Sequence, residues 1–250
     1  MDGRHCEFAG ETTWIMNSLF SNKMYPKVSW RLGVVTLACT MFASLAGAGV
    51  SVVPVPSLVS DDFDTGNATN AAPIGWKVSA AEGTTVRVVG AGVVEPASAP
   101  HCVELRDNSP KARPEMYREF PPAEAGLADA SFRVNSTSTA HMALQLRSAK
   151  GGHLCSVVFA DNGMIRHEGA EGNIISATPW TPGQWQTVQI EWFSDFTYTA
   201  SLGDSIVVQH ARFITNALPA KVYVTVGYGT VTNRIGYVDN VKVNGVVATK

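Results

Sequence analysis

The residues that could carry chemistry in this chain of 250 residues are scattered, and none forms a complete catalytic set. Glycosidases need two carboxyl groups that flank one bond, whereas the segment 190–195 offers Glu191 within a strand and Asp195 only in a turn. A G-x-S-x-G turn is absent, and the histidines after residue 100 are dispersed: His101, His141, His153, His167 and His210. The sequence therefore favours a protein without catalytic activity, with an enzyme as the alternative.

A polysaccharide lyase is one form that this alternative could take. Such an enzyme needs basic groups and a tyrosine in one groove, and the chain could assemble them from Arg147, Arg166, His167 and Tyr223. Any β-sandwich offers a comparable set, so the sequence does not favour this reading over binding.

Carbohydrate binding needs only an aromatic ring that stacks on a sugar and planar polar side chains that bond its hydroxyl groups. Trp180, between Pro179 and Pro182, is the tryptophan expected to be exposed, with a buried loop anchor as the alternative. We expect the core to hold Trp76, Trp185 and Trp192. Three polar pairs could line one concave face if their strands are neighbours, or could simply face solvent: Gln145/Arg147, Arg166/Glu168 and Gln189/Glu191.

Short strands of alternating polarity are expected to position these side chains. Five apolar sets each share one face: Ala130/Phe132/Val134, Met142/Leu144/Leu146, Val188/Ile190/Trp192, Tyr198/Ala200/Leu202 and Val222/Val224/Val226/Tyr228. Asp161-Asn162-Gly163 and Leu202-Gly203-Asp204-Ser205 predict hairpin turns, because Asn and Gly tolerate positive φ. The pattern predicts an all-β fold in which two antiparallel sheets pack as a sandwich.

The N-terminal part has a different pattern. Lys27 and Arg31 precede the apolar run 32–50, and Ala46-Gly47-Ala48 supplies a cleavage site of small residues. Together these features predict a signal peptide. An uncleaved membrane anchor is the alternative, because about 19 apolar residues can just span a bilayer. We therefore expect an N-terminal extension and signal peptide over 1–48, a linker over 49–60, one domain over 61–243 and a C-terminal tail over 244–250. The protein is expected to be secreted or held in the cell envelope.

Charge and cysteine content narrow the partners and the covalent cross-links. The formal net charge of −2 and the lack of a basic block argue against nucleic acid and anionic membranes. In an exported domain Cys102 and Cys155 could form a disulfide. Two separate buried thiols are the alternative, because the sequence cannot place the two Cα atoms within bridging range.

The segment TPGQWQTVQI (181–190), with the hairpin at Gly203-Asp204, resembles a strand and hairpin of laminin-G-like domains in the concanavalin A-like lectin/glucanase superfamily. Asp61-Asp62-Phe63-Asp64 with Gly75-Trp76, and YVDNVKV (237–243), are similar to its first and last strands. The resemblance covers 61–243 and implies a jelly roll whose terminal strands pair. The glucanase branch of that superfamily carries alternating acids on one strand, which this chain lacks, so the resemblance implies a fold more than an activity.

Asp239 raises the question of a metal. In a regular strand it shares parity with Ile235, Tyr237, Val241 and Val243, which would turn a carboxylate toward an apolar face at high cost. The resemblance implies a structural Ca²⁺ held by Asp64 and Asp239, with Asp62 as a further candidate, since oxygen ligands suit this ion. A carboxylate that secures a bulge by hydrogen bonds is the alternative.

These observations favour a secreted, non-catalytic β-sandwich module that binds a glycan or polysaccharide or serves extracellular adhesion. The candidate ligand-binding residues are Trp180, Gln189, Glu191, Arg147 and Arg166. The alternatives are a glycoside hydrolase or polysaccharide lyase, and a structural assembly protein that uses exposed edge strands.

Overall fold

A computed structural model of the chain describes residues 55–227 and 231–248. The predicted signal peptide, the linker up to residue 54, and Tyr228 lie outside these ranges. The residues that are described belong to one compact unit. Within them, no helix is long and apolar enough to cross a membrane.

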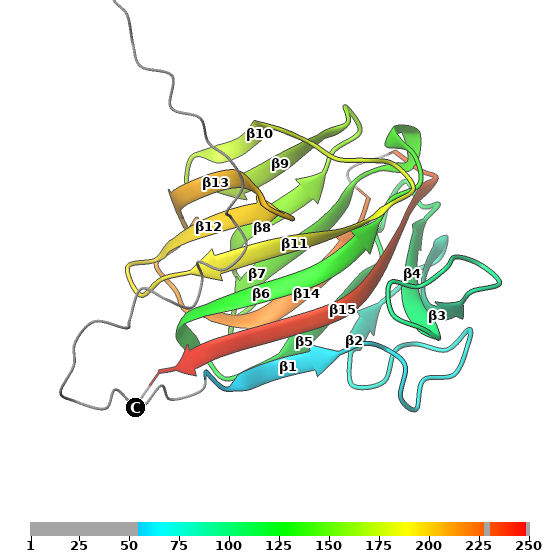
Figure 1. Cartoon of the computed structure of the whole chain (residues 1–250), viewed down its shortest axis with the longest axis horizontal. Helices are drawn as coiled ribbons and strands as arrows, with labels where there is room; N and C mark the ends of the chain where they lie inside the picture. Colours follow the sequence, from blue (N-terminus) through cyan, green and yellow to red (C-terminus); the bar gives the residue numbers. More distant parts are fainter. Residues whose placement is uncertain (1–54, 228–230, 249–250) are drawn as a thin grey trace, which may run out of the picture. The chain divides into compact units, whose positions relative to one another are not determined.

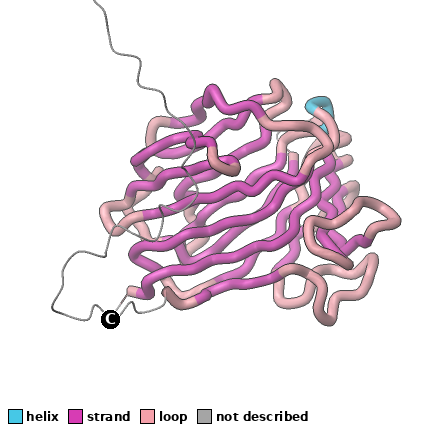
Figure 2. Tube along the Cα trace, viewed as in Figure 1, coloured by secondary structure: helices cyan, strands magenta, loops and turns pink. Residues whose placement is uncertain are grey.

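The described residues form two antiparallel sheets that pack face to face, which confirms the predicted all-β sandwich (Figure 1). Strands occupy most of the trace, and a single 3₁₀ turn at Thr137–Thr139 is the only helical element in these ranges (Figure 2). Sheet A contains, in spatial order, β13 (Ser205–Arg212), β12 (Thr197–Leu202), β11 (Trp185–Trp192), β6 (Ala123–Arg133), β15 (Arg234–Val247), β4 (His101–Asp107) and β3 (Thr84–Gly90), with β1 (Ser57–Asp61) beside β15. Sheet B contains β10 (Gly172–Pro179), β9 (Met164–Gly169), β8 (His153–Phe159), β7 (Met142–Ser148), β14 (Pro219–Val226), β5 (Glu115–Glu119) and β2 (Lys77–Ser79).

The core lies between the sheets and is built by the alternation that the sequence displays. All described members of the five predicted apolar sets are buried. Phe132 of sheet A meets Phe159 of sheet B with ring centroids 5.8 Å apart, so side chains from the two layers interdigitate. The predicted turns at 161–163 and 202–205 connect β8 to β9 and β12 to β13.

The two ends of the domain pair with each other, as the resemblance implies. β1 runs antiparallel to β15, with Ser57 opposite Asn244 and Asp61 opposite Val241 (Figure 1). The predicted boundaries are therefore wrong at both ends, because residues 57–60 of the expected linker and 244–247 of the expected tail are strand. Each segment supplies the backbone hydrogen bonds that the other needs.

A bulge in β15 overturns the parity expected around Asp239. The pairing of β15 with β6 shifts between Asp239 and Lys242, and Asn240 has φ 52°. The extra residue puts Val241 and Val243 in the main core, while Tyr237 packs in a smaller cluster on the other side of the sheet. Asp239 therefore does not share a face with Val241 and Val243.

The two cysteines are separate buried thiols, which is the second of the two alternatives that the sequence left open, and they form no disulfide. Cys155 belongs to the main core, whereas Cys102 packs with Val89, Val94 and Tyr237 in the smaller cluster. Burial raises the pKa of the Cys102 thiol to about 12 and also raises the pKa of Cys155 well above its usual range. Both thiols are protonated at neutral pH and act as small apolar groups.

Gly126 of β6 tests how tightly the sheet packs. A Cβ atom at this position would lie 2.4 Å from the Trp192 ring and 2.3 Å from the Asn244 carbonyl oxygen. Gly126→Ala should therefore lower the free energy of unfolding by about 2 kcal/mol. Gly92→Ala is the control, because nothing lies within 4 Å of its Cβ position. Urea unfolding checks both variants, and equal stability of the two would contradict the packing described.

Candidate functional site

The outer face of sheet B carries three rows of side chains that run across the strands. Strand register sets these rows, because residues paired across neighbouring strands point to the same side of a sheet. The first row is Asn173, Glu168, Ser156, Gln145, Tyr223, Tyr117 and Lys77. The second row, which lies along one side of the first, is Arg166, Val158, Ala143, Thr225 and Glu115. The third row, along the other side of the first, is His153, Arg147, Lys221 and Glu119.

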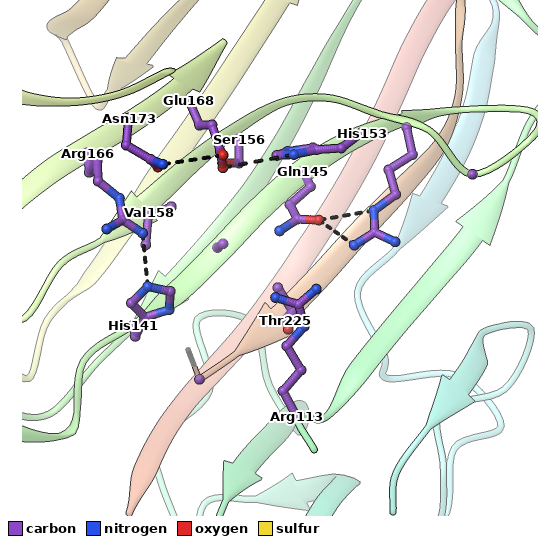
Figure 3. A pocket seen from close by; sticks show the side chains of 14 residues that line it. Arg113, His141, Gln145, His153, Ser156, Val158, Arg166, Glu168, Asn173 and Thr225 are labelled. Carbon is purple, nitrogen blue, oxygen red and sulfur yellow. Dashed lines mark hydrogen bonds and ion pairs between the residues drawn. The ribbon is translucent and has the colours of Figure 1, made fainter. Parts of the chain in front are cut away.

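A hollow of about 330 Å³ forms where the second row has small side chains. Ala143, Val158 and Thr225 make its floor, and longer polar side chains from the neighbouring rows and loops surround it (Figure 3). The side chains around this floor include Arg113, Arg147, Arg166, His141, His153 and Glu168. The hollow therefore brings basic, acidic and imidazole groups together on a small apolar base.

Arg147 is held in place before any ligand arrives. Its Nε and Nη2 atoms donate to Gln145 Oε1 at 3.1 and 2.8 Å, and its guanidinium lies 3.9 Å from the centre of the Tyr223 ring. Glu115 lies 3.7 Å away. A guanidinium fixed by an amide, a ring and a carboxylate keeps its orientation at little further entropic cost.

Arg113, just before β5, reaches the hollow from the opposite side. Its Nε donates to Glu115 Oε1 at 2.9 Å, so Glu115 anchors both Arg113 and Arg147. Within the described ranges, the terminal nitrogens of Arg113 make no hydrogen bond, and Figure 3 shows this guanidinium beside Thr225. These nitrogens are available to a group that enters the hollow.

Glu168 occupies the far wall with its oxygens already bonded. Ser156 Oγ donates to one oxygen at 3.2 Å and Asn173 Nδ2 to the other at 3.4 Å, while His153 Nδ1 lies 3.9 Å away (Figure 3). Burial lowers the pKa of His153 despite the opposing charge of Glu168. His153 Nε2 is buried and has no hydrogen-bond partner among the described residues, which is unusual for a polar atom.

His141 is held in a strained backbone conformation at the lower edge of the hollow. Its φ of 119° is rare for a residue with a side chain, and Arg234 from sheet A donates to the carbonyl oxygen of the preceding Ala140. Arg166 Nη2 lies 2.9 Å from His141 Nε2, and since a guanidinium only donates, this imidazole nitrogen accepts. Burial and then the charge of Arg166 lower the pKa of His141 to about 4.

The structure brings some of the predicted binding residues together and separates others. Arg147 and Arg166 line the same hollow, and Tyr223 lies beside Arg147. Gln189 and Glu191 belong to β11 of sheet A, so the three polar pairs are not on neighbouring strands and do not line one concave face. Sequence periodicity gives the face of each strand but not which strands become neighbours.

Trp180 is buried, which overturns its expected role as an exposed platform. Only 4% of its surface is accessible, its indole N–H donates to the Ala160 carbonyl at 3.0 Å, and its ring meets Phe159 edge-on. Trp76 and Trp192 are in the core as predicted, and Trp185 is half-buried. A tryptophan whose ring is buried and whose N–H has a hydrogen-bond partner contributes more to stability than one exposed to solvent.

The acids and the histidine of the enzymatic alternatives do not converge. Asp195 accepts hydrogen bonds from Thr197 in the turn after β11, and Glu191 is exposed on that strand. His167 points inward, where its Nδ1 lies 3.2 Å from the Tyr198 hydroxyl. Three residues of the hollow, Arg113, His141 and His153, are not predicted from the sequence. Arg113 and His141 lie just before β5 and β7, and His153 lies beside a bulge, so strand alternation does not assign them to a face.

The three aspartates of the predicted calcium site are held by hydrogen bonds. Asp239 accepts from the backbone N–H groups of Ser98 and Asn240 at 2.8 and 2.7 Å, and Asp64 accepts from the His101 N–H at 2.9 Å. Asp62 accepts from the Asp64 N–H at the surface. Burial raises the pKa of Asp239 to about 6, against its hydrogen bonds, and the nearby charge of Asp64 adds to the rise.

Calcium binds six to eight oxygen atoms. In the described part of the chain, no group of three or more His, Cys, Asp or Glu side chains could hold a metal ion. The hydrogen bonds of Asp239 match the alternative in which a carboxylate secures a bulge, and the calcium ion stays a prediction.

No family model and no curated protein sequence matches the chain. Solved structures share its fold. They include a sialidase (12% identity, 76% of this chain, 18% of that chain, TM-score 0.63) and a conserved carbohydrate esterase from the Shiga toxin-encoding bacteriophage phi24B (15%, 77%, 99%, 0.55). The cellulose-induced protein Cip1 is similar as well (14%, 77%, 99%, 0.56). The chain thus spans less than a fifth of the sialidase but nearly all of the other two, and at these identities the likeness shows the β-sandwich fold.

His141 predicts a dependence of stability on pH. Its pKa is about 4 in the folded protein and about 6.5 in the unfolded chain, so between these values the unfolded chain binds more protons. The free energy of unfolding therefore falls as the pH drops through this range. His141→Gly, which also suits the positive φ, should reduce the fall between about pH 7 and about pH 4.5 by about 2 kcal/mol. Denaturant unfolding at several pH values measures it.

His210→Gly is the matched control, because His210 also has positive φ but is exposed. An equal change of the pH profile in both variants would contradict the role given to His141.

Proposed function

We propose that the chain binds carbohydrate in the hollow on the outer face of sheet B. The observation that carries this proposal is the convergence of fixed, planar hydrogen-bonding groups around a floor of small side chains. Arg147 and Gln145 form one wall, and Glu168 with Asn173 forms the other. Sugar hydroxyl groups both donate and accept, so a site that presents both kinds of partner at fixed positions suits them.

Three of the similar structures support a role connected with carbohydrate. They are a sialidase, a carbohydrate esterase and a cellulose-induced protein. Because shared fold does not imply shared function, the proposal rests on the hollow of this chain. Export from the cell and membership of the concanavalin A-like superfamily are further parts of the proposal that rest on the sequence patterns.

Catalysis on carbohydrate is the second candidate. Glu168 lies within 3.9 Å of His153, and a carboxylate beside an imidazole can transfer protons. Both oxygens of Glu168 are bonded to neighbours, which favours a positioning role. Release of reducing or unsaturated ends from polysaccharide, abolished by Glu168→Gln with the fold intact, would support the enzyme.

Ala143→Leu tests the binding proposal, because the larger side chain fills the floor of the hollow without removing a polar group. We expect the variant to lose at least nine-tenths of the binding to glycans recognised by the native protein on a glycan array. Ala177→Leu is the control, since Ala177 is an exposed residue of β10 outside the hollow.

Circular dichroism and the unfolding midpoint establish that both variants fold. Gln145→Ala provides a second variant in case the first destabilises the sheet, and it should weaken binding in the same direction. Full binding by both folded hollow variants would contradict the proposal.

A further inference from the structure

The outer face of sheet B has a charge opposite to that of the whole chain. Its rows and the adjoining Arg113 carry five basic side chains, Lys77, Arg113, Arg147, Arg166 and Lys221, against three acidic ones, Glu115, Glu119 and Glu168. The chain as a whole has a formal net charge of −2. A positive excess gathered in and beside a concave surface raises the local concentration of anions.

At the hollow, the two acidic side chains do not cancel the basic ones where a ligand would contact them. Glu115 anchors Arg113 and Arg147 from one side, and Glu168 is bonded to Ser156 and Asn173. Arg113 keeps its terminal nitrogens for other partners within the described structure. Guanidinium groups form paired, charge-assisted hydrogen bonds with carboxylate and sulfate-like oxygen pairs, which neutral hydroxyl groups cannot match.

A second cluster extends this surface beyond the hollow. Tyr117 of β5 and Tyr223 of β14 stack with ring centroids 4.5 Å apart and planes 10° from parallel. Lys77 and Lys221 lie 5.6 and 5.4 Å from the centre of the Tyr117 ring, and both pair with Glu119. We refer to Lys77, Tyr117 and Lys221 as the tyrosine strip.

Arg147 joins the hollow to the tyrosine strip, because it lines the hollow and covers Tyr223. From Arg166 to Tyr117 the combined surface runs from β9 through β8, β7 and β14 to β5, and Lys77 lies on the adjoining β2. Four steps between neighbouring strands correspond to about 19 Å. This distance exceeds the size of one sugar ring, so a monosaccharide would contact only part of the basic side chains.

We infer that the ligand is an acidic polysaccharide whose chain crosses the strands of sheet B from the hollow to the tyrosine strip. The inference rests on the proposed function and adds the charge and the length of the ligand. The hollow holds one acidic unit against Arg113 and Arg147. The tyrosine strip receives a later unit of the same chain, with the lysines facing its charge. The carboxylate of a uronic acid and a sulfate ester both present the negatively charged oxygen atoms that the arginines and lysines would bind.

Isothermal titration calorimetry of the whole chain at low ionic strength tests this inference. The ligands are the dimer and hexamer of galacturonic acid, a heparin-derived hexasaccharide, neutral cellohexaose and a thymidine oligonucleotide. We expect at least one acidic hexasaccharide to bind at least tenfold more tightly than cellohexaose, with an affinity that falls as salt is added. The uronate and heparin arms distinguish carboxylate from sulfate.

Two variants separate the hollow from the tyrosine strip. Arg113→Ala should weaken the binding of both the galacturonate dimer and the galacturonate hexamer by about tenfold. If the heparin hexamer is the ligand that binds, its binding should weaken by the same factor. The double variant Lys77→Ala, Lys221→Ala should weaken the binding of the hexamer and leave the binding of the dimer unchanged. Arg212→Ala removes an exposed positive charge from β13 of sheet A and is the matched control. Circular dichroism verifies that each variant folds.

Each other result counts against the inference in a defined way. Cellohexaose binding as tightly as the acidic hexamers would overturn it and leave the proposed function standing. Equal affinity for acidic dimer and hexamer would overturn the crossing of the strands. Tighter binding of the oligonucleotide would identify nucleic acid as the partner, and binding of no carbohydrate in the panel would overturn both the inference and the proposed function.

Discussion

The strand register of sheet B is the constraint on which the rest of the structure depends. Because alternate residues of a strand point to opposite sides, the pairing that buries Leu144 and Leu146 also presents Ala143 and Gln145 on the outer face. A shift of one residue would move the floor of the hollow into the core. The apolar packing between the sheets, which is the main source of stability, therefore fixes the positions of the polar groups that we assign to function.

The groups around the hollow are ordered by neighbours that are themselves fixed. Glu115 pairs with Arg113 and Arg147, and Gln145 also accepts hydrogen bonds from Arg147. Arg234 of sheet A donates to the backbone carbonyl that precedes His141. Ordering in advance lowers the entropy that a ligand must remove on binding. Burial has the further consequence that His141 is uncharged near neutral pH, so the arginines and lysines supply the positive charge.

The sequence predicts local features of the fold well and the assembly of the site only in part. The alternation of apolar and polar residues correctly predicts the inner face of β6, where Phe132 is buried, because this pattern depends only on the residues of that strand. The bulge at Asp239 escapes this reading, since one extra residue reverses parity without leaving a clear signal. Arg147 and Gln189 could have shared a face if their strands were neighbours, but they lie on different sheets, because neighbour relations between distant strands depend on contacts across the whole domain. Trp180 was expected at the surface because prolines flank it, yet the area of its ring favours burial.

The central claim is that the outer face of sheet B is the ligand-binding surface. Titration of the isotope-labelled domain with a galacturonate hexamer and, separately, a heparin-derived hexamer, followed by amide chemical shifts, tests it most directly. The account predicts that the largest shifts fall on β5, β7, β8, β9 and β14 and on Arg113, with little change in β11 and β12. Shifts concentrated on sheet A, or on the loops around Asp239, would contradict it.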